Sequence, residues 1–265
     1  EDEIIISGHT YIATAAAIKL SGATPICADI DNNGMLCPDS ASKVISHNTK
    51  AIMPTQLNGR CSNMNDIMRL SEEKNLILIE DSAQGLGAKD LDIHAGGFGK
   101  FGTLSFYPAK LIGCFGDGGA ILTNDDDIYE KAKMYRDHGR NDEGIVTGLG
   151  TNARLDNLQA AFLSLRLKHY DEDIKRRREI ASFYEAVLSK SELFKLPKIE
   201  NGNNGKFNVF QNYEIEVKNR DHFQSFLRDN GIGSLIQWGG YPIYNIPTFE
   251  DTKSSKIDYK KTDNF

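Results

Sequence analysis

Residues 76–80 read Leu-Ile-Leu-Ile-Glu, an apolar run that is broken only by the acid at its end. Such a run is typical of a parallel strand buried on both faces, because a strand with one wet face shows a polar residue at every second position. Parallel neighbours need long crossover connections, which are usually helices. The run therefore predicts an α/β fold in which strands and helices alternate along the chain.

The N-terminal half shows this alternation. Strands are predicted at residues 4–7, 24–28, 50–54, 76–80, 103–107 and 119–123. Helices are predicted at residues 12–20, 39–46, 65–74 and 125–138. The rhythm predicts a three-layer αβα domain with a doubly wound sheet.

The rhythm changes in the C-terminal part of the chain. One long helix is predicted over residues 155–189, then a strand at 209–217, a helix at 221–230 and a strand at 233–238. We therefore predict a large domain over residues 1–165 and a smaller α+β domain over residues 166–265, entered by the long helix.

Composition excludes several classes of protein. The 265 residues are 40% hydrophobic and carry a formal charge of −6, which argues against disorder and against bulk attraction to nucleic acid or an anionic membrane. No apolar run approaches the roughly 20 residues of a membrane span. The one basic cluster, Lys175–Arg178, lies among acidic residues, so we interpret it as a solvated, salt-bridged helix face rather than a nucleic-acid patch.

The cysteines give no metal motif. Cys27, Cys37, Cys61 and Cys114 form no C-x-x-C pair and have no histidines at zinc-like spacing. Four scattered thiols fit a reducing cytoplasm better than a disulfide scaffold. We expect a cytoplasmic protein without a bound metal.

An acidic pair follows the apolar run, at the end of a strand where α/β proteins bind ligands. Strand alternation points Glu80 and Asp81 in opposite directions, so one of the two faces the crevice. Taken alone, such an acid is also suited to cap the next turn.

A lysine follows a second strand end. Lys110 comes after Ser105-Phe106-Tyr107-Pro108-Ala109, among small and aromatic neighbours, and Gly116-Asp117-Gly118-Gly119-Ala120 follows it. Partly apolar surroundings lower the pKa of a lysine and make its amine a nucleophile for Schiff-base formation. Pyridoxal phosphate (PLP) needs such a lysine and an acid for its ring nitrogen. Asp81 and Lys110, 29 residues apart, fit this pair.

At these motifs the sequence resembles the DegT/DnrJ/StrS family of fold-type I, PLP-dependent sugar aminotransferases. The resemblance rests on Glu80–Gln84, on Ser105–Lys110 with Gly116–Ala120, and on Asn152–Ala161, and it extends over essentially the whole chain. Any one motif is weak, but three in this order are specific. The glycines of the second motif precede a strand rather than a helix, which argues against a dinucleotide-binding loop.

The resemblance implies a role for each matching residue. Lys110 would hold PLP covalently and move the substrate proton, Asp81 would pair with the ring nitrogen, and Gln84 would bond the ring hydroxyl. Ser105 would touch the phosphate. Tyr11 would stack on the ring, although an aromatic at a helix start also suits the core.

Asn152 matches an asparagine that reaches the phosphate in the neighbouring subunit, which implies a homodimer with shared sites. The alternative is a helix N-terminal cap. The segment Ser234–Tyr241 is interpreted either as a substrate-side loop or as a strand with a buried Trp238.

The implied reaction transfers an amino group from L-glutamate to a nucleotide-linked keto sugar, for surface polysaccharide or glycoconjugate biosynthesis. Sugar dehydratases of the same family carry histidine at the position of Lys110, so the lysine favours transamination. A non-catalytic regulatory homologue is the third possibility. Because family members begin upstream of residue 4 and continue past Phe265, we expect the chain to be a fragment that lacks both ends, including a phosphate-binding Gly-Ser/Thr turn.

Overall fold

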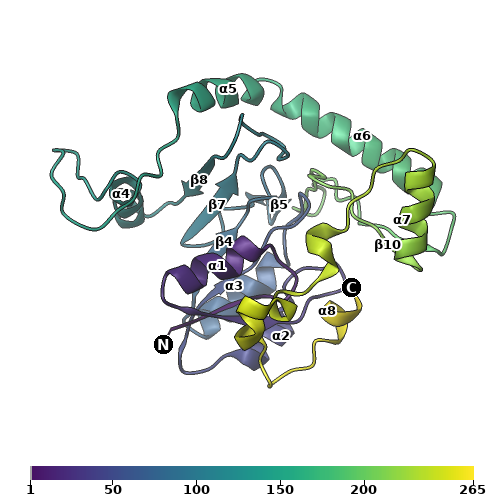
Figure 1. Cartoon of the computed structure of the whole chain (residues 1–265), viewed down its shortest axis with the longest axis horizontal. Helices are drawn as coiled ribbons and strands as arrows, with labels where there is room; N and C mark the ends of the chain where they lie inside the picture. The colour runs from purple at the N-terminus through teal and green to yellow at the C-terminus, as the bar shows by residue number, and fades with distance from the viewer. Residues whose placement is uncertain (1) are drawn as a thin grey trace.

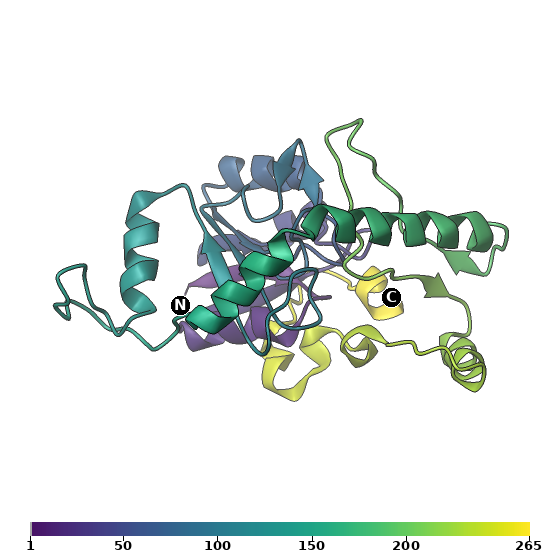
Figure 2. The same cartoon turned by 90° about the horizontal axis from the view of Figure 1, so that it is seen from above.

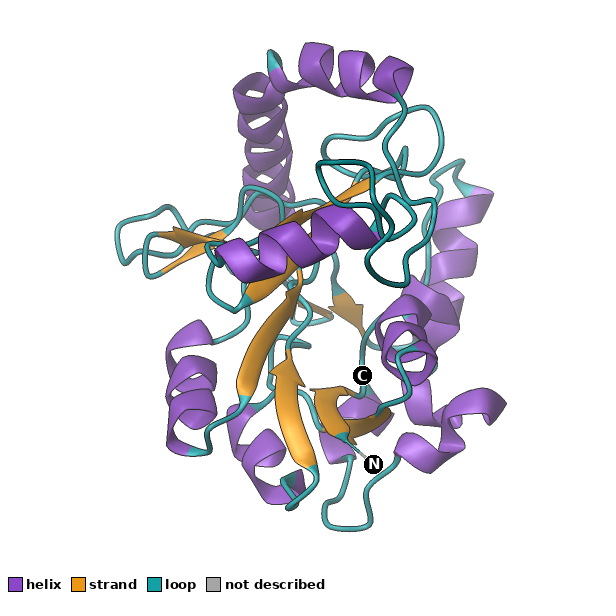
Figure 3. Ribbon diagram, turned by 90° about the vertical axis from the view of Figure 1, so that its left-hand side faces the viewer, coloured by secondary structure: helices purple, strands orange, loops and turns teal. Residues whose placement is uncertain are grey.

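Six strands form the central sheet of the protein, a computed structural model that describes residues 2–265. In spatial order they are β2 (Thr24–Ala28), β1 (Glu3–Ser7), β3 (Thr49–Met53), β4 (Ile77–Asp81), β7 (Phe101–Ser105) and β8 (Gly119–Leu122). Neighbours pair in parallel except β7 and β8, which are antiparallel. The sheet is therefore mixed, and the predicted α/β class is confirmed (Figure 3).

Two apolar clusters cover the two faces of this sheet. Because side chains alternate along a strand, Ile5 belongs to one cluster and its neighbour Ile6 to the other. The helices α2 (Pro38–Val44) and α3 (Met64–Glu73) contribute to the Ile5 cluster, and α1 (Ile12–Leu20) contributes to the Ile6 cluster. Helices on both faces give the predicted three layers (Figure 1).

Local sequence signals fix where these helices begin. Pro38 occupies the first turn of α2, where its missing N–H costs nothing. The Asn63 side chain accepts a hydrogen bond from the Asp66 N–H and so caps α3. Asp125 accepts one from the Ile128 N–H in the same way, at the start of α4 (Asp126–Tyr135).

The C-terminal segment returns to the sheet. The short helices η2 (Ile243–Asn245) and η3 (Pro247–Thr252) add apolar side chains to the Ile6 cluster. In α8 (Lys260–Asn264) the Thr262 N–H donates to Asp29 at 2.8 Å. The division into residues 1–165 and 166–265 stays a prediction.

The long helix predicted over residues 155–189 is wrong, because two helices occupy this region. They are α5 (Asn157–Leu167) and α6 (Tyr170–Leu188), which follow one another along one side of the molecule (Figures 1 and 2). The first turn of α6 contains three acids, 171–173, which favour a helix N-terminus through the helix dipole. This start signal lies inside the predicted helix.

Two C-terminal strand predictions are also wrong. Of residues 209–217 only β10 (Glu216–Val217) is a strand, and it pairs with β9 (Phe194–Lys195). Residues 233–238 form no strand; a 3₁₀ turn, η1 (Gln237–Gly240), begins there. The helix predicted over 221–230 is confirmed as α7 (Arg220–Asp229).

Two expectations about exposure need correction. Ile77, in the strand predicted to be buried on both faces, is 51% exposed. In the basic cluster Arg176 pairs with Glu179 at the surface as predicted, but Arg177 and Arg178 are half-buried and donate to backbone carbonyls of the 200–211 segment. These two arginines therefore support that segment. Within residues 2–265 no helix is long and apolar enough to cross a bilayer.

Candidate active site

Asp81 is the last residue of β4 and lies at the carboxyl edge of the sheet. Its backbone is held by the extension of β3, since the Asp81 N–H donates to Pro54 at 3.1 Å and the Gln56 N–H donates to Asp81 at 2.8 Å. Its side chain is half-buried, and Oδ2 accepts a hydrogen bond of 2.6 Å from the Thr14 hydroxyl. Oδ1 accepts from the Ala83 N–H at 3.1 Å. The carboxylate is therefore fixed in one orientation.

Glu80, the preceding residue, points to the other side and is fully buried. Its Oε1 accepts hydrogen bonds from the N–H groups of Phe98 and Gly99, and its Oε2 accepts from the Gly96 N–H and the Gln56 amide. Glu80 thus fastens the loop between β6 (Ile93–His94) and β7. Of the two acids, Asp81 is the one available to a ligand.

Lys110 lies in the turn that follows β7 and is half-buried. Desolvation lowers the pKa of its amine, and the negative charge of Asp81 acts in the opposite direction. The amine and the carboxylate therefore interact electrostatically at one edge of the sheet, as the sequence predicts. A Cβ at Gly113 would lie 2.6 Å from the Pro108 oxygen, so this tight turn requires glycine there.

The Gln211 side chain holds the turn on both sides of Lys110. Its Oε1 accepts from the Leu111 N–H at 2.6 Å, and its Nε2 donates to the Ala109 carbonyl at 2.8 Å. Gln211 is itself buried, and its own carbonyl accepts from Arg177 at 2.9 Å. A residue far along the chain therefore fixes the backbone of Lys110.

Gln84 is held by a network of side-chain amides. Its Oε1 accepts from the Asn58 N–H at 2.9 Å and from the Gln237 amide at 3.4 Å. The Asn58 side chain in turn bonds Gln237, Asn212 and Glu214. The Gln84 oxygen is already used by these hydrogen bonds. The Nε2 group has no hydrogen-bond partner among residues 2–265, so it is the part of the side chain available to a ligand.

Ser105 and Tyr11 lie at the ends of two strands that are separated by β3 and β4, since Tyr11 follows β1 and Ser105 ends β7. Ser105 ends β7, and its hydroxyl accepts from the Tyr107 N–H at 3.3 Å. Tyr11 precedes α1 and is 52% exposed, which excludes the alternative that it packs in the core. Its ring lies 6.2 Å from that of Trp238.

Asn152 lies apart from this group. It is exposed, forms a backbone bridge with Asp137 near the end of α4, and accepts a side-chain bond from Arg154 at 3.1 Å. The N-cap position of α5 is occupied by Asp156, so the helix-cap alternative for Asn152 is wrong.

The segment Ser234–Tyr241 reaches the same edge of the sheet. Trp238 has a left-handed backbone (φ 51°) and packs against His9 with ring centroids 4.7 Å apart, so the alternative of a strand with a buried Trp is wrong. Burial lowers the pKa of His9 to about 4, with help from the nearby Arg60 charge, so its imidazole is neutral at pH 7.

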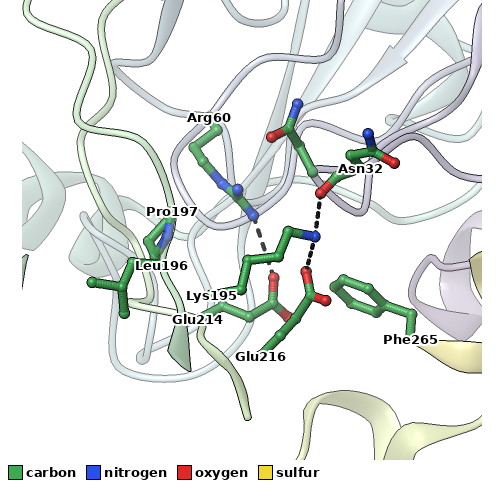
Figure 4. A pocket seen from close by; sticks show the side chains of 9 residues that line it. Asn32, Arg60, Lys195, Leu196, Pro197, Glu214, Glu216 and Phe265 are labelled. Carbon is green, nitrogen blue, oxygen red and sulfur yellow. Dashed lines mark hydrogen bonds and ion pairs between the residues drawn. The ribbon is translucent and has the colours of Figure 1, made fainter. Parts of the chain in front are cut away.

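A pocket lies beside the side-chain network of Gln84 and Asn58, at the junction of the N-terminal part and the β9–β10 region (Figure 4). There the Arg60 guanidinium pairs with Glu214 at 3.3 Å, and Lys195 pairs with Glu216. Its free volume is about 20 Å³, enough for roughly one water molecule and not for a cofactor. It contains none of the residues predicted from the sequence.

Several residues of the site escape sequence-based prediction. Asn58 and Gln211 belong to segments without a motif. Thr14 ends the His9–Thr14 segment that resembles the family around Tyr11, but the resemblance gives it no role. The roles of all three follow from contacts between distant segments. Thr10 lies just before α1 and Thr14 lies in its first turn, and this close spacing is the one sequence signal that brings two hydroxyls together. No group of three potential metal ligands is present in the described part of the chain.

The sequence is similar to those of curated proteins with different names. One relative, "Pleiotropic regulatory protein" of Geobacillus stearothermophilus, is 36% identical over 94% of this chain. "dTDP-3-amino-3,6-dideoxy-alpha-D-galactopyranose transaminase" of Aneurinibacillus thermoaerophilus is 38% identical over 91% of this chain. The chain spans 66% and 65% of the lengths of these two relatives.

Solved structures share the fold. A ketimine complex of DesV from S. venezuelae has a TM-score of 0.91 and 32% identity, covering 98% of this chain and 70% of that one. NtdA from Bacillus subtilis, with bound cofactor PMP, has a TM-score of 0.84 and 28% identity, covering 98% of this chain and 60% of that one.

The fold and the paired lysine and carboxylate define a protein of the PLP-dependent transferase class. The model of the DegT/DnrJ/EryC1/StrS aminotransferase family matches residues 1–265, and the chain belongs to this family.

Proposed function

We propose that this chain forms the cofactor-binding part of a PLP-dependent aminotransferase that moves an amino group from L-glutamate to a nucleotide-linked keto sugar. The observation that carries the proposal is the pair of Lys110 and Asp81 at one sheet edge, where the carboxylate acts electrostatically on a partly desolvated amine. Family membership and the transaminase names of relatives support it.

The residues present fit PLP. When bound, this cofactor supplies an aldehyde that reacts with amines and a ring that withdraws electrons from the reacting carbon. Lys110 is the amine for that aldehyde, and its lowered pKa increases the neutral, nucleophilic fraction. Asp81 is the partner for a protonated ring nitrogen, and the free Nε2 of Gln84 is a donor for the ring oxygen.

Each residue has a separate task in this proposal. Lys110 takes a proton from the substrate carbon and returns it, as a general base and then a general acid. The Asp81 carboxylate stays in one orientation beside the ring nitrogen while that proton moves, because both its oxygens accept hydrogen bonds from the protein. Tyr11 covers the ring and Ser105 binds the phosphate.

The substrate class comes from the relatives. Several are named as transaminases or aminotransferases of dTDP- or UDP-linked sugars. A sugar dehydratase is the second candidate function, but the lysine at position 110 favours transamination. A non-catalytic regulatory role is the third, and the intact pair of Lys110 and Asp81 disfavours it.

Mass spectrometry tests the reaction directly. The protein is incubated with PLP, L-glutamate and a panel of nucleotide-linked keto sugars, and the products are weighed. Transamination yields an amino sugar and 2-oxoglutarate, whereas dehydration yields a sugar that has lost a hydroxyl. K110A should abolish product formation, and K175A, which alters an exposed lysine of α6, should not. Formation of the deoxy product alone would support the dehydratase instead.

We further propose a homodimer in which Asn152 serves the partner's site. Exposed apolar side chains on α5 support an interface there, since Leu158 is 80% exposed and Leu167 is 58% exposed. If the sites are shared, each site contains Lys110 of one subunit and Asn152 of the other, so K110A and N152A remove residues from different subunits. Mixing the two inactive variants should then restore part of the activity, because one site of each mixed dimer is intact. No restoration in dimers shown to exchange subunits would contradict the shared site.

We place the protein in the cytoplasm. All four cysteines are free thiols, and Cys27 and Cys114 are buried. Free thiols are typical of a reducing compartment such as the cytoplasm.

A further inference from the structure

Three buried threonine hydroxyls form a chain that ends on Asp81. The Thr10 hydroxyl lies 2.7 Å from that of Thr55 and 2.8 Å from that of Thr14, which donates to Asp81 at 2.6 Å. The threonines are 1%, 4% and 3% exposed, respectively, so bulk water does not compete for these hydrogen bonds. They come from different segments, namely the residues before α1, the first turn of α1 and the residues after β3.

The number of protons fixes the direction of this chain. An ionised carboxylate only accepts, so Thr14 must use its single hydroxyl proton on Asp81. In the bond between Thr14 and Thr10, Thr14 must then be the acceptor and Thr10 the donor. Thr10 has thereby used its own proton, so Thr55 must donate to it. All three O–H groups therefore point toward the carboxylate, and hydrogen bonds aligned in this way polarise one another.

A purely local role does not explain this arrangement. A threonine inside a helix usually bonds the carbonyl of its own preceding turn. Thr14 instead directs its hydroxyl away from α1 to the end of β4. The chain also links the ends of neighbouring strands, because Thr55 forms a parallel backbone bridge with Asp81 itself.

We propose that Thr14, Thr10 and Thr55 are positioning residues that hold the Asp81 carboxylate in the orientation in which it meets the ring nitrogen of the cofactor. This inference rests on the proposed function. The threonines act only through Asp81, and Thr14 carries most of the effect because it makes the direct, charge-assisted bond.

Isosteric valine variants test the proposal, with serine as the conservative control. T14V should weaken PLP binding about tenfold or more, since a hydrogen bond to a charged group is lost, and T14S should bind like the unmodified protein. T10V and T55V should give smaller, graded losses. T14V should also raise the midpoint of the pH titration of the PLP–lysine absorbance. A less well-aligned Asp81 leaves the ring nitrogen less fully protonated, and the ring then withdraws less charge from the lysine nitrogen conjugated with it.

A cofactor-free measurement separates this inference from the proposed function. The ¹³C carboxyl signal of Asp81 at pH 7 should shift in T14V and, more weakly, in T55V, but not in T14S. If the unmodified protein does not bind PLP, the proposed function fails, and the carboxyl signal still tests the threonine chain.

Thermal unfolding of each variant shows whether it is folded. T55V carries the test if T14V does not fold, because the Thr55 side chain bonds Thr10 and not the Asp81 carboxylate. The threonine chain is refuted if the valine variants fold, the Asp81 signal stays in place and PLP binds as it does to T14S.

Discussion

The buried carboxylate of Glu80 offers the sharpest stability prediction. Its Oε1 takes the N–H groups of Phe98 and Gly99, and its Oε2 takes the Gly96 N–H and the Gln56 amide. In E80Q one oxygen is replaced by an NH₂ group, which is a donor. In either orientation of the amide this group faces two N–H donors, so two hydrogen bonds are lost. Two bonds to a charged group are worth about 3–6 kcal/mol, and relief from burying the charge offsets part of this. We expect the free energy of unfolding to fall by about 3 kcal/mol.

Urea unfolding followed by circular dichroism measures this loss. The midpoint should fall while the m-value stays unchanged, because the same surface is exposed on unfolding. The control is E73Q, which alters a 61% exposed carboxylate on α3 and should change stability by less than about 0.5 kcal/mol. If E80Q unfolds within about 1 kcal/mol of the unmodified protein, the reasoning from the Glu80 hydrogen bonds is refuted.

Two further predictions concern side chains near the site. Because burial lowers the pKa of His9 from 6.5 to about 4, the unfolded chain binds a proton in this window that the folded protein does not, so stability falls as the pH drops below 6.5. Between pH 7 and pH 5 the free energy of unfolding of H9F should therefore fall by about 2 kcal/mol less than that of the unmodified protein. Denaturant unfolding at the two pH values measures this difference. Equal falls for the two proteins would contradict the buried neutral imidazole. Q211L leaves two backbone groups beside Lys110 without partners and should cost about 2–4 kcal/mol in the same assay. Q159L, which removes a similar pair of bonds from an exposed loop, should cost less than about 1 kcal/mol, and equal costs for the two variants would refute the role of burial.

The N-terminal half of the fold could be predicted because its signals are local. The helix at residues 12–20 and the strand at 24–28 have the predicted bounds, and strand alternation separated Asp81 from Glu80 as expected. Pairing a strand-end acid with a strand-end lysine needed only the rule that parallel strands end at the same sheet edge.

The C-terminal part depends on contacts that a local pattern does not contain. Apolar spacing continues across the junction of α5 and α6, so the break near Lys168 shows only in the acids that begin the second helix. Residues 209–211 look like a strand, yet the Val209 N–H donates to Gly59 and the next two carbonyls accept from Arg177. Tertiary partners thus replace the neighbouring strand.

The same limit applies to the site. Motifs supplied the residues that we propose to face a ligand. The groups that hold them, such as Asn58 behind Gln84 and Gln211 beside Lys110, come from segments far away in the sequence. Only the folded chain brings these partners together.

Chemical trapping shows whether Lys110 is the residue to which PLP attaches. The protein is incubated with PLP and reduced with borohydride, and the modified peptide is identified by mass spectrometry. We expect a pyridoxyl group on Lys110 of the unmodified protein and no pyridoxyl group after K110A. A pyridoxyl group on another lysine in the unmodified protein, with Lys110 free, would contradict this expectation.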